Sequence, residues 1–288
     1  MKAMILAAGL GTRLRPLTDD RPKALVELSG RTLLEITLSR LRSLGVTEVI
    51  VNVHHFADMV VEYLKSNNNF GMHIEISGED VLLDTGGGLK KAAWFFLENS
   101  ARRHSKSGHS NQMDKPFLLH NVDVISNIDL RRMLQFHKEN RALATLAVQA
   151  RETSRPLLFD EHLQLRGRII GPDSKPELVR RNLADTLQKG AASAVPKNHK
   201  NPGALAPAAE SSQPFQALAF SGIHVISPRL LPLLTEEGVF SIIPSYLRLS
   251  AQGEKILAFR ADQYYWRDLG RPADLAQAAL DLQQRVLH

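Results

Sequence analysis

Hydrophobic and polar residues follow two distinct patterns along the first half of the chain. Short apolar runs bounded by glycine or charge are typical of buried strands, and segments with apolar residues three and four positions apart are typical of helices. Strands that alternate with helices predict a parallel sheet covered on both faces. Strands are expected at residues 2–7, 48–53, 72–77 and 117–121, and helices near 34–41 and at 57–65, 88–97 and 129–139.

Two polar stretches interrupt this pattern. Residues 98–115 contain no Leu, Ile, Val or aromatic residue, and residues 171–214 contain six prolines, eight alanines and no aromatic residue. Neither stretch offers enough apolar surface to offset the entropy lost on ordering. Both are therefore expected to be polar surface insertions or flexible segments, and the second leaves room for one short helix over residues 178–187.

Regular structure is expected again from Phe215 onward. This third of the chain either completes the first sheet or adds a small lobe. Its last helix begins at Pro272, because proline is favoured at the first helical position. The expected elements are a strand at 215–226, helices at 230–234 and 240–249, two strands at 255–260 and 263–268 joined by a short turn, and the final helix.

Composition narrows the class of protein. Apolar residues make up 43% of the 288 and charged residues 23%, which is typical of a globular chain, and no apolar run is long enough for a membrane span. The absence of cysteine excludes disulfides, thiolate zinc sites and cysteine nucleophiles, and it is compatible with a cytoplasmic location. The net charge of +6 would suit nucleic acid, but a basic site for phosphorylated substrates or a solvated basic surface explains it as well.

A glycine-rich loop follows the first expected strand. Gly9 and Gly11 would let backbone N–H groups converge on an anion at the carboxyl end of the strand, and Arg13 and Lys23 add positive charge. The spacing differs from a P-loop, since no Gly-Lys-Ser/Thr follows, and from a dinucleotide fingerprint, since Leu14 replaces the third glycine. The loop therefore predicts phosphate binding, and a tight turn that merely exposes basic residues is the alternative.

A second glycine cluster, Leu83-Asp84-Thr85-Gly86-Gly87-Gly88, lies between an expected strand and an expected helix. Its glycines allow a flat ligand to lie against bare backbone, and a helix start adds oriented N–H groups. A flexible first helical turn is the alternative.

Two aspartates each end an expected strand. Asp123 follows residues 117–121, and Asp268 closes residues 263–268. Mg²⁺ binds one or two carboxylates together with phosphate oxygens, although either aspartate alone is more often a helix cap or a surface acid. The nearby Asp129 is expected to cap a helix, and His54, His55 and His120 are assigned no chemistry because their spacing is not that of a metal site.

The segment from Leu6 to Thr18, followed by Arg21-Pro22-Lys23-Ala24-Leu25-Val26, closely resembles the signature of sugar-1-phosphate nucleotidyltransferases. The resemblance covers Met1 to Ala150 and again Phe215 to the end. It implies an α/β fold with a Rossmann-like, mostly parallel mixed sheet flanked by helices, similar to glycosyltransferase A. Residues 1–288 would form a single domain, with a nucleotide-binding half at 1–150 and a small β/α sugar-binding portion at 215–288.

The same resemblance implies roles for individual residues. Arg13 and Lys23 would be catalytic, Asp123 and Asp268 would hold Mg²⁺, and Gly222 and Trp266 would bind the sugar, with a core role as the alternative for the last two. Val122 departs from the family, which usually has glycine there. A β-branched residue resists positive φ and adds bulk near the substrate phosphate, and a small shift of the metal site, an altered substrate and no effect are the three alternatives. The residues implied to bind the nucleoside triphosphate are Leu6, Ala7, Ala8, Gly9, Gly11, Thr12, Arg13, Thr85, Gly86, Gly87 and Asn121.

The resemblance implies condensation of a nucleoside triphosphate with a sugar 1-phosphate. The triple glycine is most similar to uridylyltransferases that act on N-acetylmuramic acid 1-phosphate, with mannose- or heptose-1-phosphate guanylyltransferases as the alternative. A non-catalytic regulator that senses sugar nucleotides is an alternative of another class, whereas a nucleic-acid binder lacks a recognition motif. The expected partners are the two substrates, without nucleic acid or membrane, and the chain is expected to be a monomer or a small homo-oligomer.

Overall fold

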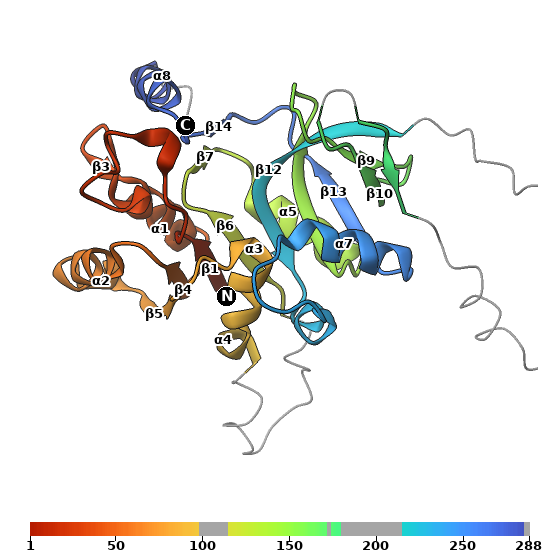
Figure 1. Cartoon of the computed structure of the whole chain (residues 1–288), viewed down its shortest axis with the longest axis horizontal. Coiled ribbons are helices and arrows are strands. Elements are labelled where there is room, and N and C mark those ends of the chain that lie inside the picture. Colours follow the sequence, from red (N-terminus) through yellow and green to blue (C-terminus); the bar gives the residue numbers. More distant parts are fainter. Residues whose placement is uncertain (98–114, 172–173, 180–214, 285–288) are drawn as a thin grey trace, which may run out of the picture.

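The computed structural model describes residues 1–97, 115–171, 174–179 and 215–284. Their centre is one mixed sheet of ten strands with helices on both faces (Figure 1), which confirms the expected fold class. The insertions expected at 98–115 and 171–214 lie outside the described residues except for Lys115, Gly171 and residues 174–179. The strands of the large sheet are β1 (Lys2–Leu6), β4 (Glu48–Val53), β5 (His73–Gly78), β6 (Phe117–Asn121), β8 (Ala144–Gln149), β9 (Leu157–Phe159), β10 (Leu165–Arg168), β11 (Glu177–Leu178), β12 (Gln216–Ile226) and β13 (Ile256–Arg260).

The sheet has a parallel part and an antiparallel part that meet where β6 pairs with β12. β1 lies between β4 and β6 and runs parallel to both, and β5 extends the parallel part beyond β4. β12 runs antiparallel to β6, β8 and β9, so the C-terminal third completes the first sheet. The carboxyl ends of β1 and β6 therefore lie at one edge of the sheet, side by side.

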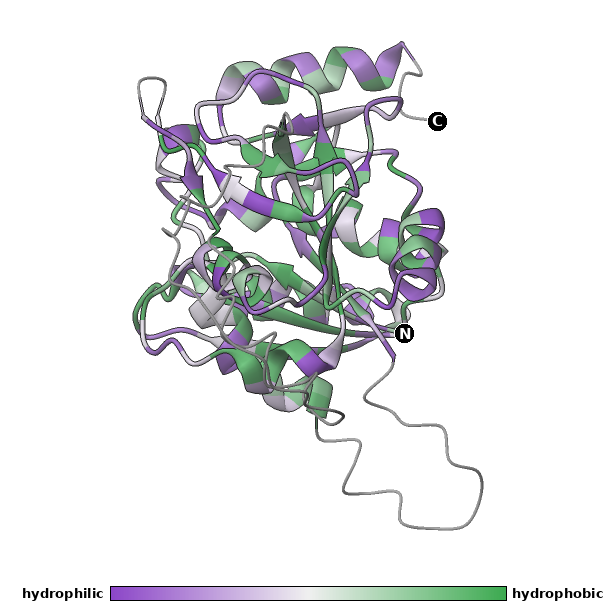
Figure 2. Cartoon of the chain, turned by 90° about the vertical axis from the view of Figure 1, so that its right-hand side faces the viewer, coloured by the Kyte–Doolittle hydropathy of each residue, from purple (hydrophilic) through white to green (hydrophobic). Residues whose placement is uncertain are grey.

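Helices cover both faces because successive side chains of a strand point to opposite sides. The helices are α1 (Leu33–Ser43), α2 (Ala57–Ser66), α3 (Asp84–Lys91), α4 (Ala93–Leu97), α5 (Leu130–Glu139), α7 (Ile242–Ala251) and α8 (Pro272–Gln283). In β1, Ala3 and Ile5 belong to one apolar cluster with α1, α2 and α5, and Met4 and Leu6 belong to a second cluster with α3 and α7. Figure 2 shows the central strands as mainly hydrophobic and the helices as mixed.

The helix expected at 88–97 begins earlier and is broken. α3 already starts at Asp84 and includes all three glycines, and α4 is a separate helix. The N–H groups of Gly86 and Gly87 donate to the Phe240 carbonyl at 2.9 and 3.1 Å. Donors at a helix start need partners from outside the helix, so this carbonyl allows the helix to begin before the glycines end.

The C-terminal elements differ from expectation in their pairing. β13 runs parallel to β8, whereas β14 (Trp266–Asp268) pairs with β7 (Val124–Ser126) in a separate two-stranded sheet, so the two expected strands are not neighbours.

Leu178 lies in strand β11 instead of a helix. Residues 228–233 form a 3₁₀ helix. Pro244 lies in the first turn of α7, where its missing N–H costs no helical bond. Among the described residues, no helix has both the length and the apolar character needed to span a membrane.

Candidate active site

The loops after β1 and β6 start from adjacent positions. Leu6, the last residue of β1, pairs with Asn121, the last residue of β6, and the Val122 N–H donates to the Leu6 carbonyl at 3.1 Å. Ligands of open α/β sheets bind at this edge, outside the carboxyl ends of the strands. The glycine loop and the segment that contains Asp123 thus share one location.

Gly9 and Gly11 have different roles in the first loop. Gly11 has a φ of +65°, and a Cβ there would lie 2.9 Å from the Thr18 methyl group, so the turn itself requires glycine. A Cβ at Gly9 would meet only the end of the Lys23 side chain, with its Nζ 3.6 Å away. Because the chain does not require glycine at position 9, its bare backbone leaves room for a ligand.

The Lys23 side chain links the glycine loop after β1 to the segment after β6 that contains Asp123. It begins the 3₁₀ helix η2 (Lys23–Leu25), and its Nζ lies 2.7 Å from Asp123 Oδ2. The two side chains are only 15% and 9% exposed. Removing one partner of such an ion pair leaves a charge without compensation in a poorly hydrated place, so the pair fixes both side chains.

Asp268 reaches the same place from β14. Asp268 pairs in register with Val124, and the Leu269 N–H donates to the Asp123 carbonyl at 2.7 Å. Its Oδ1 accepts the Gly270 N–H at 2.7 Å and lies 3.9 Å from Arg13 Nη2. Burial, and then the negative charge of Asp123, raise the pKa of Asp268. The structure therefore brings together the two aspartates, Arg13 and Lys23.

The two aspartates suit a hard divalent cation. Among the described residues, no group of three or more His, Cys, Asp or Glu side chains could hold a metal ion by itself. Mg²⁺ needs only one or two carboxylates, because phosphate and water oxygens complete its shell, whereas zinc prefers nitrogen and sulfur ligands. A cation between Asp123 and Asp268 would also relieve the repulsion that raises the pKa of Asp268. The residues present therefore fit Mg²⁺.

Val122 does not add bulk to this site. Its side chain is 1% exposed and lies in the apolar cluster that also contains Val124 and Ile125. It is also absent from the described residues that have a positive φ. The expected conflict between a β-branched residue and the site therefore does not arise, since the side chain points into the core.

A cavity of about 340 Å³ lies beside the glycine loop, and part of the expected nucleotide site lines it. Lys23 and Asp123 line it as well, and so do Asn52 and Glu79, which the sequence left without a role. The Glu79 carboxylate accepts hydrogen bonds from Asn52 Nδ2 at 2.7 Å and from the Leu83 N–H at 2.9 Å. The expected nucleotide-binding residues that line the cavity are Leu6, Ala8, Gly9, Thr85 and Asn121.

Other expected nucleotide-binding residues contact the protein itself. The Ala7 N–H donates to Asn52 Oδ1 at 2.7 Å. A Cβ on Gly86 would lie 2.3 Å from the Phe240 ring, and one on Gly87 would lie 2.5 Å from the Gly238 carbonyl. The glycine cluster thus permits close packing of α3 against residues 238–240. Thr12 and Arg13 are exposed in the 3₁₀ turn η1 (Thr12–Leu14), and neither lines the cavity.

A second cavity of about 480 Å³ has Asp84, Thr85 and Asn121 in common with the first, so the two cavities adjoin at these residues and are together called the cleft. Gly222 and Trp266, expected to bind the sugar, are not among its lining residues. Gly222 has a φ of +72°, and a Cβ there would lie 2.9 Å from Asn121 Nδ2, so glycine lets β12 approach β6.

Trp266 is held by its neighbours. Its Nε1 donates to the Ser221 carbonyl at 2.7 Å, and the Arg151 guanidinium carbon lies 3.8 Å from the ring centroid. Arg151 also donates from Nη2 to the Phe220 carbonyl at 2.7 Å. Burial lowers the pKa of Arg151, and the negative charge of Asp268 opposes this shift. Sequence reasoning missed Arg151, because no motif surrounds it and its neighbours come from distant segments.

The histidines have structural surroundings. Burial, together with the positive charge of Arg40, lowers the pKa of His120 to about 3, so this imidazole is neutral at ordinary pH. His54 contacts the Glu79 carbonyl oxygen through Nδ1 at 2.7 Å, and His55 is exposed. That none of them takes part in the chemistry stays a prediction.

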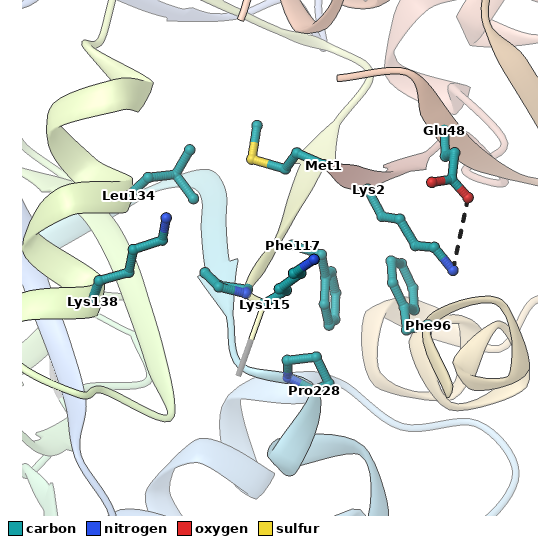
Figure 3. Close-up of a pocket in the computed structure, with 10 residues that line it drawn as sticks. Met1, Lys2, Glu48, Phe96, Lys115, Phe117, Leu134, Lys138 and Pro228 are labelled. Atoms are coloured by element: carbon teal, nitrogen blue, oxygen red, sulfur yellow. Dashed lines mark ion pairs between the residues drawn. The ribbon is translucent and has the colours of Figure 1, made fainter. Parts of the chain in front are cut away.

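Another hollow of about 400 Å³ lies at the opposite edge of the sheet (Figure 3). Lys2 and Glu48, which begin β1 and β4, line it as a pair 4.0 Å apart, together with Phe96, Phe117 and Lys115. Glu48 is the one acid among its lining residues, so this hollow has no counterpart of the Asp123–Asp268 pair.

The sequence is similar to known nucleotidyl transferases. The sequence profile of the family described as nucleotidyl transferase matches residues 2–159. N-acetylmuramate alpha-1-phosphate uridylyltransferase of Caulobacter vibrioides is 54% identical over 93 residues, which are 31% of this chain and 38% of that protein. Mannose-1-phosphate guanyltransferase beta-B of Xenopus laevis is 27% identical over 295 aligned positions, which cover 100% of this chain and 66% of that protein. The matches thus span less than two thirds of these curated relatives.

A solved structure shares the fold along the whole chain. The crystal structure of HddC from Yersinia pseudotuberculosis complexed with GMP-PN has a TM-score of 0.64 against this chain at 18% sequence identity. The alignment covers 98% of this chain and 99% of that one. The TM-score supports a shared architecture, and an identity of 18% supports nothing beyond the fold.

Proposed function

The chain belongs to the nucleotidyl transferase family, and we propose that it joins a nucleoside triphosphate to a sugar 1-phosphate with release of pyrophosphate. The observation that carries this proposal is that Lys23, Asp123 and Asp268 lie close together beside the glycine loop. Three segments that are far apart in the sequence supply these side chains. In the reaction, an oxygen of the sugar phosphate forms a bond to the α-phosphorus, and the bond from the α-phosphorus to the oxygen of the pyrophosphate breaks.

The residues of the cleft are suited to positioning and charge stabilisation. A phosphate monoester is already ionised at neutral pH, so the attacking oxygen needs no general base. Lys23 would hold the attacking phosphate and the charge that develops at phosphorus, and Arg13 would neutralise the departing pyrophosphate. Gly9 would give the triphosphate access to the backbone, because no side chain covers it.

Asp123 and Asp268 would hold Mg²⁺, which when bound offsets negative charge on the phosphate oxygens. Lys23 would keep Asp123 in place through their 2.7 Å ion pair, and the Gly270 N–H would orient Asp268 Oδ1.

The substrates we favour are UTP and N-acetylmuramic acid 1-phosphate or a similar sugar. The 54% identity to the Caulobacter vibrioides protein lies in a 93-residue segment and supports this pair. GTP with a mannose or heptose 1-phosphate is the alternative, and the match to the Xenopus laevis mannose-1-phosphate guanyltransferase, which covers all of this chain and 66% of that protein, supports GTP with mannose 1-phosphate. Both pairs use the same cleft, because the two reactions differ only in the base and the sugar.

A substrate panel tests the proposal. The chain is incubated with each common nucleoside triphosphate, a set of sugar 1-phosphates and Mg²⁺, and pyrophosphate release is measured. We expect release that requires both substrates and that is fastest with UTP and N-acetylmuramic acid 1-phosphate. No release with any combination would contradict the proposed activity, whereas fastest release with GTP and a neutral sugar would favour the alternative pair.

A further inference from the structure

Two arginine side chains line the larger cavity of the cleft. Arg155 and Arg168 line this cavity of about 480 Å³, and neither lines the smaller cavity that contains Lys23 and Asp123. Asp84 is the one acid that lines the larger cavity. A binding site for an uncharged hexose needs hydrogen-bond partners but no net positive charge, so the two guanidinium groups call for an explanation.

Strand pairing brings the two arginines together. Arg168, the last residue of β10, pairs in register with Leu157, the first residue of β9, two positions after Arg155. The Ile169 N–H donates to the Pro156 carbonyl at 3.0 Å and extends this pairing. Both residues therefore lie at the same end of the β9–β10 hairpin, Arg168 at the end of β10 and Arg155 in the segment just before β9, and both line the cavity.

Much of the donor capacity of these arginines is unused within the described part of the chain. Arg168 forms an ion pair with Glu177, in which its Nε donates to Oε2 at 2.6 Å, and its Nη groups make no hydrogen bond to a described residue. The Arg155 side chain has no hydrogen bond or ion pair to any described residue. Asp84 Oδ1 is occupied by the Thr85 N–H at 2.5 Å. A guanidinium offers five N–H donors in a planar fork that matches the oxygens of a carboxylate or a phosphate.

We propose that Arg155 and Arg168 bind an acidic group, a carboxylate or a phosphate, on the sugar ring of the substrate, away from its 1-phosphate. This inference rests on the proposed function and specifies the class of sugar. The 1-phosphate itself must reach Lys23 and Asp123, which line the other cavity, so the arginines are left to contact a substituent of the ring. The shared residues Asp84, Thr85 and Asn121 mark the junction where the ring would lie between them.

Matched substrate pairs test the proposal. N-acetylmuramic acid 1-phosphate and N-acetylglucosamine 1-phosphate differ only in the acidic lactyl group, and glucose 1,6-bisphosphate and glucose 1-phosphate differ only in a second phosphate. The nucleoside triphosphate is the one the chain uses best. We expect kcat/KM to favour the acidic member of at least one pair by roughly 10- to 100-fold, the ratio that corresponds to one or two charge-assisted hydrogen bonds. Which pair shows the preference identifies carboxylate or phosphate as the group bound.

Variants then assign the preference to the two arginines. Arg155→Gln and Arg168→Gln are each expected to lower the ratio of kcat/KM between the acidic and the neutral substrate, and the double variant is expected to bring it near one. Arg132→Gln is the matched control. Arg132 is exposed on α5, away from the cleft, and its substitution removes the same charge. Thermal unfolding confirms that each variant is folded.

Three results would overturn the inference. The unmodified chain could use both members of both pairs equally well, the double variant could keep the original ratio, or Arg132→Gln could lower the ratio as much as the cleft variants do. In each case pyrophosphate release itself persists, so the proposed function would stand. Absence of release with every sugar 1-phosphate would instead contradict the proposed function and this inference with it.

Discussion

Lys23 and Asp123 are 100 positions apart in the sequence, and their Nζ and Oδ2 atoms lie 2.7 Å apart. The pair joins the glycine loop after β1 to the segment after β6, at the edge where β14 delivers Asp268. One cation and two acids of the cleft thereby depend on one another for position. The ion pair ties the fold of this edge to the proposed chemistry.

Loss of either partner of this pair should abolish most of the activity. We expect Lys23→Ala and Asp123→Asn each to lower pyrophosphate release on the order of 10²- to 10³-fold, as the loss of a group that stabilises transition-state charge does. Breaking a buried ion pair can also cost about 3–5 kcal/mol of stability. Circular dichroism and urea unfolding are therefore measured beside turnover.

The double variant Lys23→Ala/Asp123→Asn separates the two effects. It leaves no carboxylate without its partner, so it should recover part of the stability lost in Lys23→Ala and none of the activity. Turnover close to that of the unmodified chain in either single variant would contradict the assigned roles.

Asp268→Asn should make the protein more stable at neutral pH and inactive. Burial and the charge of Asp123 raise the folded-state pKa of Asp268 above its ordinary value of 3.8. Its contribution to stability is therefore fully present below that value and is lost as the pH rises through the raised pKa. Asparagine keeps an acceptor for the Gly270 N–H and removes the repulsion. We expect a higher melting temperature than that of the unmodified chain at pH 7 and a smaller difference near pH 4; a lower melting temperature at both would refute this.

Gly87→Ala should destabilise the fold even without a ligand. A Cβ at this position would lie 2.5 Å from the Gly238 carbonyl, which is backbone and has little freedom to move. Overpacking of this kind costs about 1–3 kcal/mol. Gly78→Ala is the control, since a Cβ at Gly78 meets nothing within 4 Å. Urea unfolding distinguishes the two, and equal midpoints would show that residues 83–88 do not pack on residues 238–240 as described.

The buried histidines should destabilise the protein in acid. Burial lowers the pKa of His224 to about 3 from 6.5, so between these values the unfolded chain binds a proton that the folded chain does not. Stability is then lost as the pH falls, at about 1.4 kcal/mol per pH unit for each such histidine. His224→Phe should flatten the dependence of unfolding free energy on pH between 6 and 4.5, and exposed His55→Gln should not. An unchanged slope in His224→Phe would show that His224 is protonated in the folded protein.

The sequence predicted the parallel half of the sheet well because its signals are local. β4 and β6 have the expected limits, and Asp129 caps α5 by accepting the Arg132 N–H at 2.9 Å. The start of α3 was predicted too late, because a carbonyl from Phe240 supplies the missing acceptor and nothing near residue 84 announces it. The pairing of β14 with β7 likewise depends on tertiary packing.

The candidate site was predicted in part for the same reason. Asp123 and Asp268 stand at strand ends, and a motif drew attention to each, so their convergence could be expected. Gly86 and Gly222 also lie in motifs, yet their bare Cα atoms face Phe240 and Asn121 of the chain itself. Periodicity and motifs place a glycine in a loop, but only the packed structure shows which neighbour requires its small size.

The proposed metal site can be observed directly. The protein is crystallised with Mn²⁺, a non-hydrolysable nucleoside triphosphate analogue and the preferred sugar 1-phosphate, and anomalous diffraction locates the manganese. We expect a manganese ion bound by both Asp123 and Asp268 next to Lys23, and loss of that ion in Asp123→Asn. Manganese bound by only one of the two aspartates, or bound elsewhere in the cleft, would contradict it.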